Sequence, residues 1–310
     1  MKIFVYTSFP RDQQLTLKQH LPAGLELMMK PAIPEAEMKR SFQSAEIILG
    51  NPPVEWFENM PSSLKFWQLD SAGFDQYRHL RVNCPVANMG DFFARQCSET
   101  IVGGILSFYR GLNHLTRLQD LKKWDGKNVR SELGTLGDKN VLILGSGAIG
   151  LAVKKILSGF GCTIKTTARH NPIADFHTLE ETLSALPGTS LVINTLPGTA
   201  DHYVSSRFFD AMTRGSVYAS IGRGNTTDER AMVEALRSGK LAGAILDVTE
   251  TEPLPRDSLL WGMKNVILTQ HTGGGIETEA EGILKQFIRN LNSLIRKEEI
   301  PDLVDLSRGY

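Results

Sequence analysis

Three polar residues in the second half of the chain have side chains suited to chemistry at a carbonyl group: Arg223, Glu252 and His271. A guanidinium fork binds a carboxylate and polarises a carbonyl. An imidazole delivers a proton, and a nearby carboxylate stabilises its charged form. Together the three would suit reduction of a 2-oxo acid. Each has an ordinary alternative: Arg223 as a surface turn residue, His271 as a structural histidine, Glu252 as a solvated carboxylate. Spacing alone does not show that they converge.

The stretch KNVLILGSGAIG, residues 139–150, has the pattern of an anion-binding turn. An apolar strand runs into three glycines, and a helical pattern follows. The first glycine allows a tight turn, the second lets the backbone approach a pyrophosphate, and the third lets helix and strand pack. The free N–H groups of the helix N-terminus would face the phosphates. The motif therefore predicts a dinucleotide site, with a purely structural turn as the alternative. Its residues are Gly145, Gly147, Ala148, Ile149 and Gly150.

The end of the next strand, 163–167, bears on the choice of cofactor. An NAD site normally has an acidic residue there, about 20 positions after the first glycine, to bind the ribose 2′-hydroxyl. Ala168 stands in that place, followed by Arg169 and His170. Without the carboxylate a 2′-phosphate is not repelled, and an arginine forms charge-assisted bonds to it. We therefore expect NADPH to be favoured, with NAD possible. The alternative is that Arg169 and His170 are solvated loop residues.

Strand and helix patterns alternate after the glycine turn, as in a parallel α/β sheet. With the strand at 141–144, the expected strands are 163–167, 191–194, 217–220, 244–247 and 266–269. A capping box at Thr226-Thr227-Asp228-Glu229 would begin a helix that ends before Gly239.

The first hundred residues predict a smaller parallel α/β unit, with strands at 2–8, 45–49 and 64–69 and a helical stretch at 16–21. A long helix is expected from Thr100 to Leu121 and another from Glu277 to Arg296. Between the first of these and the glycine turn, residues 122–138 are expected to form a surface loop.

Length and composition exclude several classes of protein. A chain of 310 residues favours two domains. Its 34 basic and 34 acidic residues give no net charge, which does not favour nucleic acid or an anionic membrane. Cys84, Cys97 and Cys162 are widely spaced and suggest neither disulfides nor a metal site, so a reducing, cytoplasmic location is expected. The first residues resemble a strand more than a signal peptide. No apolar run is long enough to span a bilayer.

The order of the motifs resembles a known family along nearly the whole chain. The matching segments are SAGFD at 71–75, the glycine turn, Thr195-Leu196-Pro197, residues 220–248, EPLP at 252–255, His271 and the closing LVDLSRGY. They are similar to the NAD(P)-dependent D-isomer-specific 2-hydroxyacid dehydrogenases, which include glyoxylate and hydroxypyruvate reductases.

The resemblance implies a role for each matching residue. Arg223 would bind the substrate carboxylate and carbonyl, His271 would be the acid/base, and Glu252 would pair with it. The amides of Ala72 and Gly73 would receive the substrate carboxylate. Asp247 would hold the nicotinamide carboxamide. The remaining implied cofactor contacts are Thr195, Leu196, Pro197, Ile221 and His271.

The resemblance also implies an architecture of two doubly wound parallel-sheet domains. A Rossmann cofactor domain, residues 98–283, would be inserted in a smaller flavodoxin-like substrate domain formed by 1–97 and 284–310. The helices near Thr100 and Glu277 would be hinges. A homodimer acting on a small 2-oxo or 2-hydroxy acid is implied, with no metal.

Two further segments depart from the family pattern, and two other classes of protein are alternatives to it. The family usually has threonine where His202 stands, and Gly273-Gly274-Gly275 is unusually rich in glycine. These glycines would give backbone room for substrate or form a flexible loop. Formate dehydrogenases resemble the family but carry glutamine in place of the glutamate. The C-terminal-binding-protein corepressors share the fold and use the nucleotide chiefly to recruit partners, with little turnover.

Overall fold

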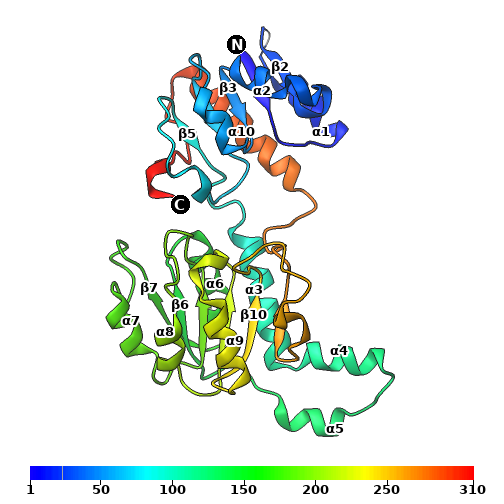
Figure 1. Cartoon of the computed structure of the whole chain (residues 1–310), viewed down its shortest axis with the longest axis vertical. Helices are drawn as coiled ribbons and strands as arrows, with labels where there is room; N and C mark the ends of the chain where they lie inside the picture. Colours follow the sequence, from blue (N-terminus) through cyan, green and yellow to red (C-terminus); the bar gives the residue numbers. More distant parts are fainter. Residues whose placement is uncertain (23) are drawn as a thin grey trace. The chain divides into compact units, whose positions relative to one another are not determined.

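The computed structural model describes residues 1–22 and 24–310. The chain divides into two compact units (Figure 1). Unit 1 combines Met1–Phe93 with Ile276–Tyr310, and unit 2 is the continuous segment Ala94–Gly275. One unit is therefore inserted into the other along the chain.

Unit 1 is built on a parallel sheet with strand order β2-β1-β3-β4-β5. The central strands are short, continuous apolar runs that are buried on both faces, as parallel sheets require. Helices α1 and α10 cover one face, where Leu17 and Phe287 pack against Ile3. Helix α2 covers the other face, where Phe42 packs against Phe4. The elements are β1 (Lys2–Val5), α1 (Arg11–His20), β2 (Glu26–Met29), α2 (Glu35–Gln43), β3 (Ile47–Leu49), β4 (Phe66–Gln68), β5 (Val86–Ala87) and α10 (Glu279–Arg296).

Unit 2 is built on a second parallel sheet, with order β11-β10-β9-β8-β6-β7. Helices α3 and α6 pack together on one face, and α7, α8 and α9 cover the other (Figure 1). The strands are β6 (Asn140–Leu144), β7 (Thr163–Thr167), β8 (Leu191–Asn194), β9 (Ser216–Ser220), β10 (Leu241–Leu246) and β11 (Val266–Leu268). The helices are α3 (Ala94–Tyr109), α4 (Leu112–Asp120), α5 (Gly126–Val129), α6 (Ala148–Ser158), α7 (Leu179–Ala185), α8 (Ser206–Ala211) and α9 (Glu229–Arg237).

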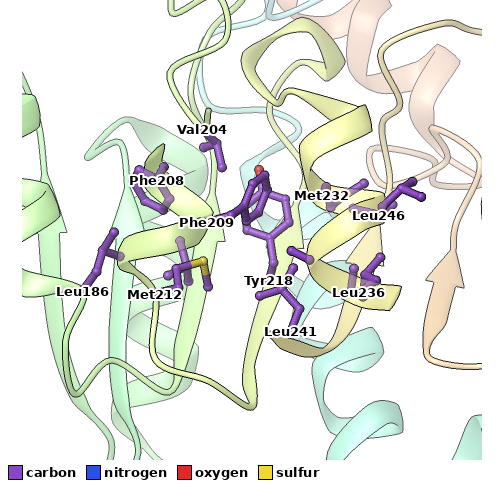
Figure 2. Packing of buried hydrophobic residues seen from close by; sticks show 14 of the residues in the cluster. Leu186, Val204, Phe208, Phe209, Met212, Tyr218, Met232, Leu236, Leu241 and Leu246 are labelled. Carbon is purple, nitrogen blue, oxygen red and sulfur yellow. The ribbon is translucent and has the colours of Figure 1, made fainter. Parts of the chain in front are cut away.

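The core between the unit 2 sheet and helices α7 to α9 centres on Tyr218 of β9. Figure 2 shows its ring between the side chains of α8 and those of α9. Phe209 meets it edge-on, with ring centroids 5.5 Å apart. The buried hydroxyl is not left without a partner, because Asn194 donates to it at 2.9 Å. This core fixes the strands whose carboxyl ends carry the site.

The expected fold class is confirmed: both units are doubly wound parallel sheets, and all six strands expected in unit 2 are present. In each sheet the strand order reverses once, between β1 and β3 in unit 1 and between β6 and β8 in unit 2. Ligands of open α/β sheets bind outside the carboxyl ends of the strands at such reversal points.

Several expected element boundaries were wrong. The helix expected over 100–121 is broken into α3 and α4, because Gly111 adopts a left-handed φ of 64° between them. The loop expected over 122–138 contains the short helix α5. Strand β1 ends at Val5, before the expected residue 8, and α1 starts at Arg11, before the expected residue 16.

The expected capping box at Thr226 was also wrong. Thr226 lies in a short 3-10 turn, and its hydroxyl donates to the Arg223 carbonyl at 2.6 Å. The N-cap of α9 is Asp228, whose carboxylate accepts from the Ala231 amide. The helix does end before Gly239, which has a left-handed φ of 69°.

The two units divide before helices α3 and α10. The domain limits expected from the resemblance, residues 97 and 283, fall inside those helices. A continuous helix is one rigid element. When the chain divides at the start of a helix, all the residues of that helix pack within one unit.

Candidate active site

The turn between β6 and α6 is shaped by glycine. Gly145 has a φ of 99°, and a Cβ there would lie 2.7 Å from the Thr195 hydroxyl. A Cβ on Gly150 would lie 2.2 Å from the Gly145 carbonyl oxygen. The first and third glycines are therefore required by contacts inside the protein, as the motif predicts.

The second glycine has a different reason. Gly147 is the N-cap of α6 with an extended φ of −76°, and a Cβ there would meet no described atom within 4 Å. The first amides of α6, at Ala148 and Ile149, have no acceptor within their helix. Open space next to free amides at a helix N-terminus fits a bound phosphate group. The residues present therefore fit a dinucleotide.

The loop after β7 places two basic residues near this turn. Arg169 and His170 are both exposed. Asn171 joins their loop to the glycine turn, since its side-chain amide donates to the Ser146 hydroxyl at 2.8 Å. Burial raises the pKa of Tyr203, and the nearby Arg169 guanidinium opposes that rise. The loop thus carries positive charge beside the turn, with Ala168 in the place of the NAD-type acid.

The strand-end loops of β8, β9 and β10 lie against one another. The amide of Leu196 donates to Asn194 Oδ1 at 3.0 Å, and the amide of Ile221 donates to the Asn194 carbonyl at 2.9 Å. The backbone of Gly222 lies against Leu196, and that of Gly224 lies against Thr249. Residues expected at the cofactor, Thr195 to Pro197 and Ile221, are therefore next to the loops that carry Arg223 and Glu252.

His271 and Glu252 are in direct contact. His271 Nδ1 and Glu252 Oε2 are 2.5 Å apart, and both side chains are partly exposed. The other carboxylate oxygen accepts from the Thr249 amide at 3.0 Å, which fixes its orientation. Among the residues that the structure describes, none bonds to His271 Nε2. The pair lines a cleft of about 520 Å³ within unit 2, with Leu254, Trp261 and Gln270 among its other walls.

Arg223 lies in the neighbouring loop, and its Nη1 donates to the Gly222 carbonyl at 3.1 Å. Burial raises the pKa of the Cys97 thiol to about 11, the Asp247 carboxylate raises it further, and Arg223 lowers it. Arg223 and Asp247 therefore both lie near Cys97. The structure brings His271 and Glu252 into contact, and it places the loop that carries Arg223 against the loop that carries Glu252, where Gly224 meets Thr249.

The turn after β11, residues 269–273, is fastened to Asp247. This aspartate is 4% exposed. Its carboxylate accepts from the Thr269 hydroxyl at 2.6 Å and from the Gly273 amide at 3.0 Å, and its carbonyl accepts from the His271 amide at 2.6 Å. A Cβ on Gly273 would lie 2.6 Å from Asp247 Oδ2, so this glycine serves a close approach. Thr269 was not among the predicted site residues, because no motif gives a signal for it.

In unit 1, the loop at Ala72 and Gly73 is expected to receive the substrate carboxylate, and its backbone carbonyls accept hydrogen bonds from a neighbouring segment. Met89 N donates to the Ser71 carbonyl at 3.1 Å, and Asn88 Nδ2 donates to the Ala72 carbonyl at 2.6 Å. In a planar trans peptide the N–H points opposite to the preceding carbonyl. The amides of Ala72 and Gly73 therefore point away from Asn88 and Met89. Asn88 was also not among the predicted site residues.

The departure at His202 has a partner in the site loops. Its Nε2 lies 3.2 Å from Glu250 Oε1. This hydrogen bond is the main cause of a raised His202 pKa. Both side chains are exposed, so the pair contributes little to stability.

Residues 1–22 and 24–310, which the structure describes, show neither a membrane-spanning helix nor a metal-binding cluster. No helix among them is both long and apolar enough to cross a membrane. No group of three or more His, Cys, Asp or Glu side chains among them is placed to hold a metal ion.

Comparison with known proteins gives consistent matches. The model of the "D-isomer specific 2-hydroxyacid dehydrogenase, NAD binding domain" matches residues 102–273. A probable 2-ketogluconate reductase of Dictyostelium discoideum is 30% identical over 258 residues, which is 77% of either chain. Glyoxylate/hydroxypyruvate reductase A of Salmonella heidelberg (strain SL476) is 30% identical over 223 residues, 69% of either chain. A D-isomer specific 2-hydroxyacid dehydrogenase from Xanthobacter autotrophicus Py2, crystallised with NADPH and MES, has a TM-score of 0.82 and 25% identity, and covers 100% of this chain and 99% of its own.

Proposed function

The chain belongs to the NAD(P)-dependent D-isomer-specific 2-hydroxyacid dehydrogenase family, and from this premise we propose that it reduces a small 2-oxo acid to the D-2-hydroxy acid with NADPH. The observation that carries the proposal is the 2.5 Å contact between His271 Nδ1 and Glu252 at the wall of a cleft. It leaves Nε2 as the nitrogen that delivers a proton. The nicotinamide cofactor, when bound, supplies the hydride.

The protein's own groups then have separate tasks. His271 Nε2 protonates the substrate oxygen as negative charge develops on it, and Glu252 stabilises the resulting imidazolium through Nδ1. Arg223 binds the substrate carboxylate and polarises the carbonyl. The amides of Ala72 and Gly73 receive the carboxylate. The helix N-terminus at Gly147 binds the pyrophosphate.

Substitution of the triad tests these roles. Arg223→Ala is expected to lower kcat/KM by roughly a hundredfold or more, because a charge-assisted contact to the substrate is lost. Glu252→Gln is expected to move the pH above which reduction fades to a lower value, since the neutral amide does not stabilise the imidazolium. A near-unchanged kcat/KM in the first variant, or an unchanged pH profile in the second, contradicts the role of that residue.

A preference for NADPH is supported by Ala168 in place of an acid and by Arg169 and His170 after β7. NADPH is also the nucleotide bound in the Xanthobacter relative. The ratio of kcat/KM for NADPH to that for NADH measures the preference, and a clear preference for NADH rejects it. Arg169→Ala should weaken NADPH far more than NADH.

A glyoxylate- or hydroxypyruvate-like substrate is supported by the Salmonella relative, and a longer sugar-derived 2-oxo acid by the Dictyostelium relative. A panel of 2-oxo acids tested with both nicotinamide cofactors decides between them. Tight cofactor binding without oxidation by any member of the panel would favour the corepressor-like alternative.

We further propose a homodimer in a reducing, cytoplasmic location, as the family resemblance implies. Helices α4 and α5 extend from the rest of unit 2 (Figure 1), and this region exposes Leu112, Leu121 and Trp124. Exposed apolar side chains gathered on one projection are typical of interaction surfaces. Light scattering of the purified protein tests the dimer, and a monomer at micromolar concentration rejects it.

A further inference from the structure

The turn that carries His271 has an unusual backbone. Gln270 and His271 have φ values of 54° and 55°, so two consecutive residues other than glycine are left-handed. Side chains with a Cβ rarely adopt this conformation, and it persists where surrounding contacts hold it. The contacts that hold it determine where the His271 ring lies.

Several of those contacts converge on one buried residue, Asp247. The Asp247 carbonyl accepts from the His271 amide at 2.6 Å, so the strained residue is itself fastened. Asp247 Oδ1 accepts from the Thr269 hydroxyl at 2.6 Å, the Thr272 amide at 3.1 Å and the Gly273 amide at 3.0 Å. The residues on both sides of His271 are thereby tied to one carboxylate oxygen.

The two oxygens of Asp247 are used differently. Oδ1 has three donors from the turn, whereas Oδ2 has a single longer contact of 3.2 Å, with the Gly273 amide. The family resemblance gives Asp247 a role at the nicotinamide carboxamide. Oδ2 can still accept a hydrogen bond from that group. Thr269 contacts Oδ1 alone. A change at Thr269 therefore affects the turn without removing the oxygen available to the cofactor.

We propose that Thr269 and Asp247 are positioning residues, which hold the left-handed turn so that His271 stays aligned with Glu252 for proton delivery. The inference rests on the proposed function of His271 as the acid. Without the Thr269 hydroxyl, the charged Oδ1 loses its shortest contact, the turn gains freedom, and the ring leaves its 2.5 Å contact with Glu252 for part of the time. Proton delivery slows while cofactor binding persists.

The test compares Thr269→Val, which keeps the shape and removes the hydroxyl, with Thr269→Ser, which restores it. Thr269→Val should lower kcat by roughly ten- to a hundredfold, the scale of a small misplacement of a reacting group. Its NADPH Kd should stay within about twofold of the unmodified value, and Thr269→Ser should recover most of the kcat. Thr16→Val is the matched control, because it removes a hydroxyl that donates to the Asp12 carbonyl on α1 of unit 1, and it should leave kcat unchanged.

A second measurement separates this inference from the proposed function. The ring resonances of His271, identified by their loss in His271→Gln, are followed by NMR without substrate. Thr269→Val should shift and broaden them, and Thr269→Ser should not. If the unmodified protein reduces no 2-oxo acid but the resonances still respond, the proposed function fails and the positioning role stands. Unchanged resonances, an unchanged kcat in Thr269→Val or no recovery in Thr269→Ser each overturn the inference.

Discussion

The two units follow the same winding order yet use their reversal points differently. In unit 1, Gly50 has a φ of 109° and its backbone lies against Thr7 of the neighbouring strand end. In unit 2, Gly145 has a φ of 99° and lies against Thr195 in the same way. After Gly145 a helix begins at Gly147, whereas Gly50 is followed by Asn51-Pro52-Pro53. The shared topology gives each unit a reversal point, and the local residues decide whether that point presents amides to an anion.

In unit 1 the amides expected to bind an anion lie in the loop after β4, not in the loop after β3 that carries Gly50. They are oriented in a different way from those of unit 2. The loop after β4 begins no α-helix, and its carbonyls are tied down by Asn88, Met89 and the Ser71 hydroxyl. In unit 2 the amides are free because a helix starts there. In unit 1 the amides of Ala72 and Gly73 point away from Asn88 and Met89, because the preceding carbonyls accept from those residues. Substitutions that affect one device and not the other test this distinction.

The largest effect is expected at Gly147. A Cβ there has no described neighbour within 4 Å, and the extended backbone suits valine, so the fold should persist while the valine side chain fills the phosphate space. We expect the NADPH Kd to rise by roughly a hundredfold or more, in the range of several lost charge-assisted bonds. Titration of cofactor fluorescence measures the Kd, and Tm should remain unchanged.

Gly150→Ala is the variant to compare with Gly147→Val, because Gly150 is required by a contact inside the protein and not by the cofactor. Its Cβ would lie 2.2 Å from a carbonyl oxygen, so Tm should fall. If Gly147→Val binds NADPH normally, the helix N-terminus is not the phosphate site.

An intermediate effect is expected at Asn88 in unit 1. Asn88→Ala removes the donor to the half-buried Ala72 carbonyl, and the loss of such a hydrogen bond costs about 0.5–1.5 kcal/mol. The loop should lose its orientation, and KM for the 2-oxo acid should rise roughly tenfold while the NADPH Kd is unchanged. Steady-state kinetics and cofactor titration measure the two. Asn128→Ala, at an exposed asparagine of α5, is the control. Equal losses of substrate and cofactor binding would argue against two independent devices.

The smallest effect is expected where the Thr7 hydroxyl donates to Asp70 Oδ2 at 2.8 Å. Burial raises the pKa of Asp70, and the Thr7 hydrogen bond opposes the rise. The folded protein thus holds this proton more tightly than the unfolded chain does. The associated stability is complete below the unfolded value of about 3.8 and is lost as the pH rises through the raised folded value.

Asp70→Asn should therefore raise Tm at pH 7 by roughly 2–4 °C, and the gain should vanish towards pH 4. Thermal unfolding at a series of pH values measures this. Asp91→Asn, at an exposed carboxylate, should show no such trend. If the rise in Tm for Asp70→Asn does not change with pH, the desolvation of the Asp70 charge is not the cause of the rise.

Sequence patterns predicted the parts of the molecule whose signals are local. The glycine turn, the six strands of unit 2 and the end of α9 before Gly239 each depend on a few consecutive residues. The order of motifs also gave the family. The break at Gly111 was not predicted, because a single glycine within a helical pattern is compatible with either a continuous or a broken helix.

Residues that hold the site depend on contacts between distant segments. Thr269 reaches Asp247 only because β10 and β11 pair in parallel, with Leu246 opposite Leu268. Asn88 reaches Ala72 across the pairing of β4 with β5. The Thr226 capping box failed for a similar reason, since the Thr226 hydroxyl accepts from the side-chain amide of Asn194, at the end of β8, at 2.8 Å.

The insertion of unit 2 into unit 1 has a consequence for biosynthesis. The core around Ile3 and Leu17 contains Phe287 and Leu291 of α10, so the sheet of unit 1 lacks one of its covering helices until α10 has been translated. Unit 2 is continuous and has all its core residues once Gly275 has left the ribosome. The nascent protein would thus complete its nucleotide-binding unit first, while strands β1 to β5 wait for α10.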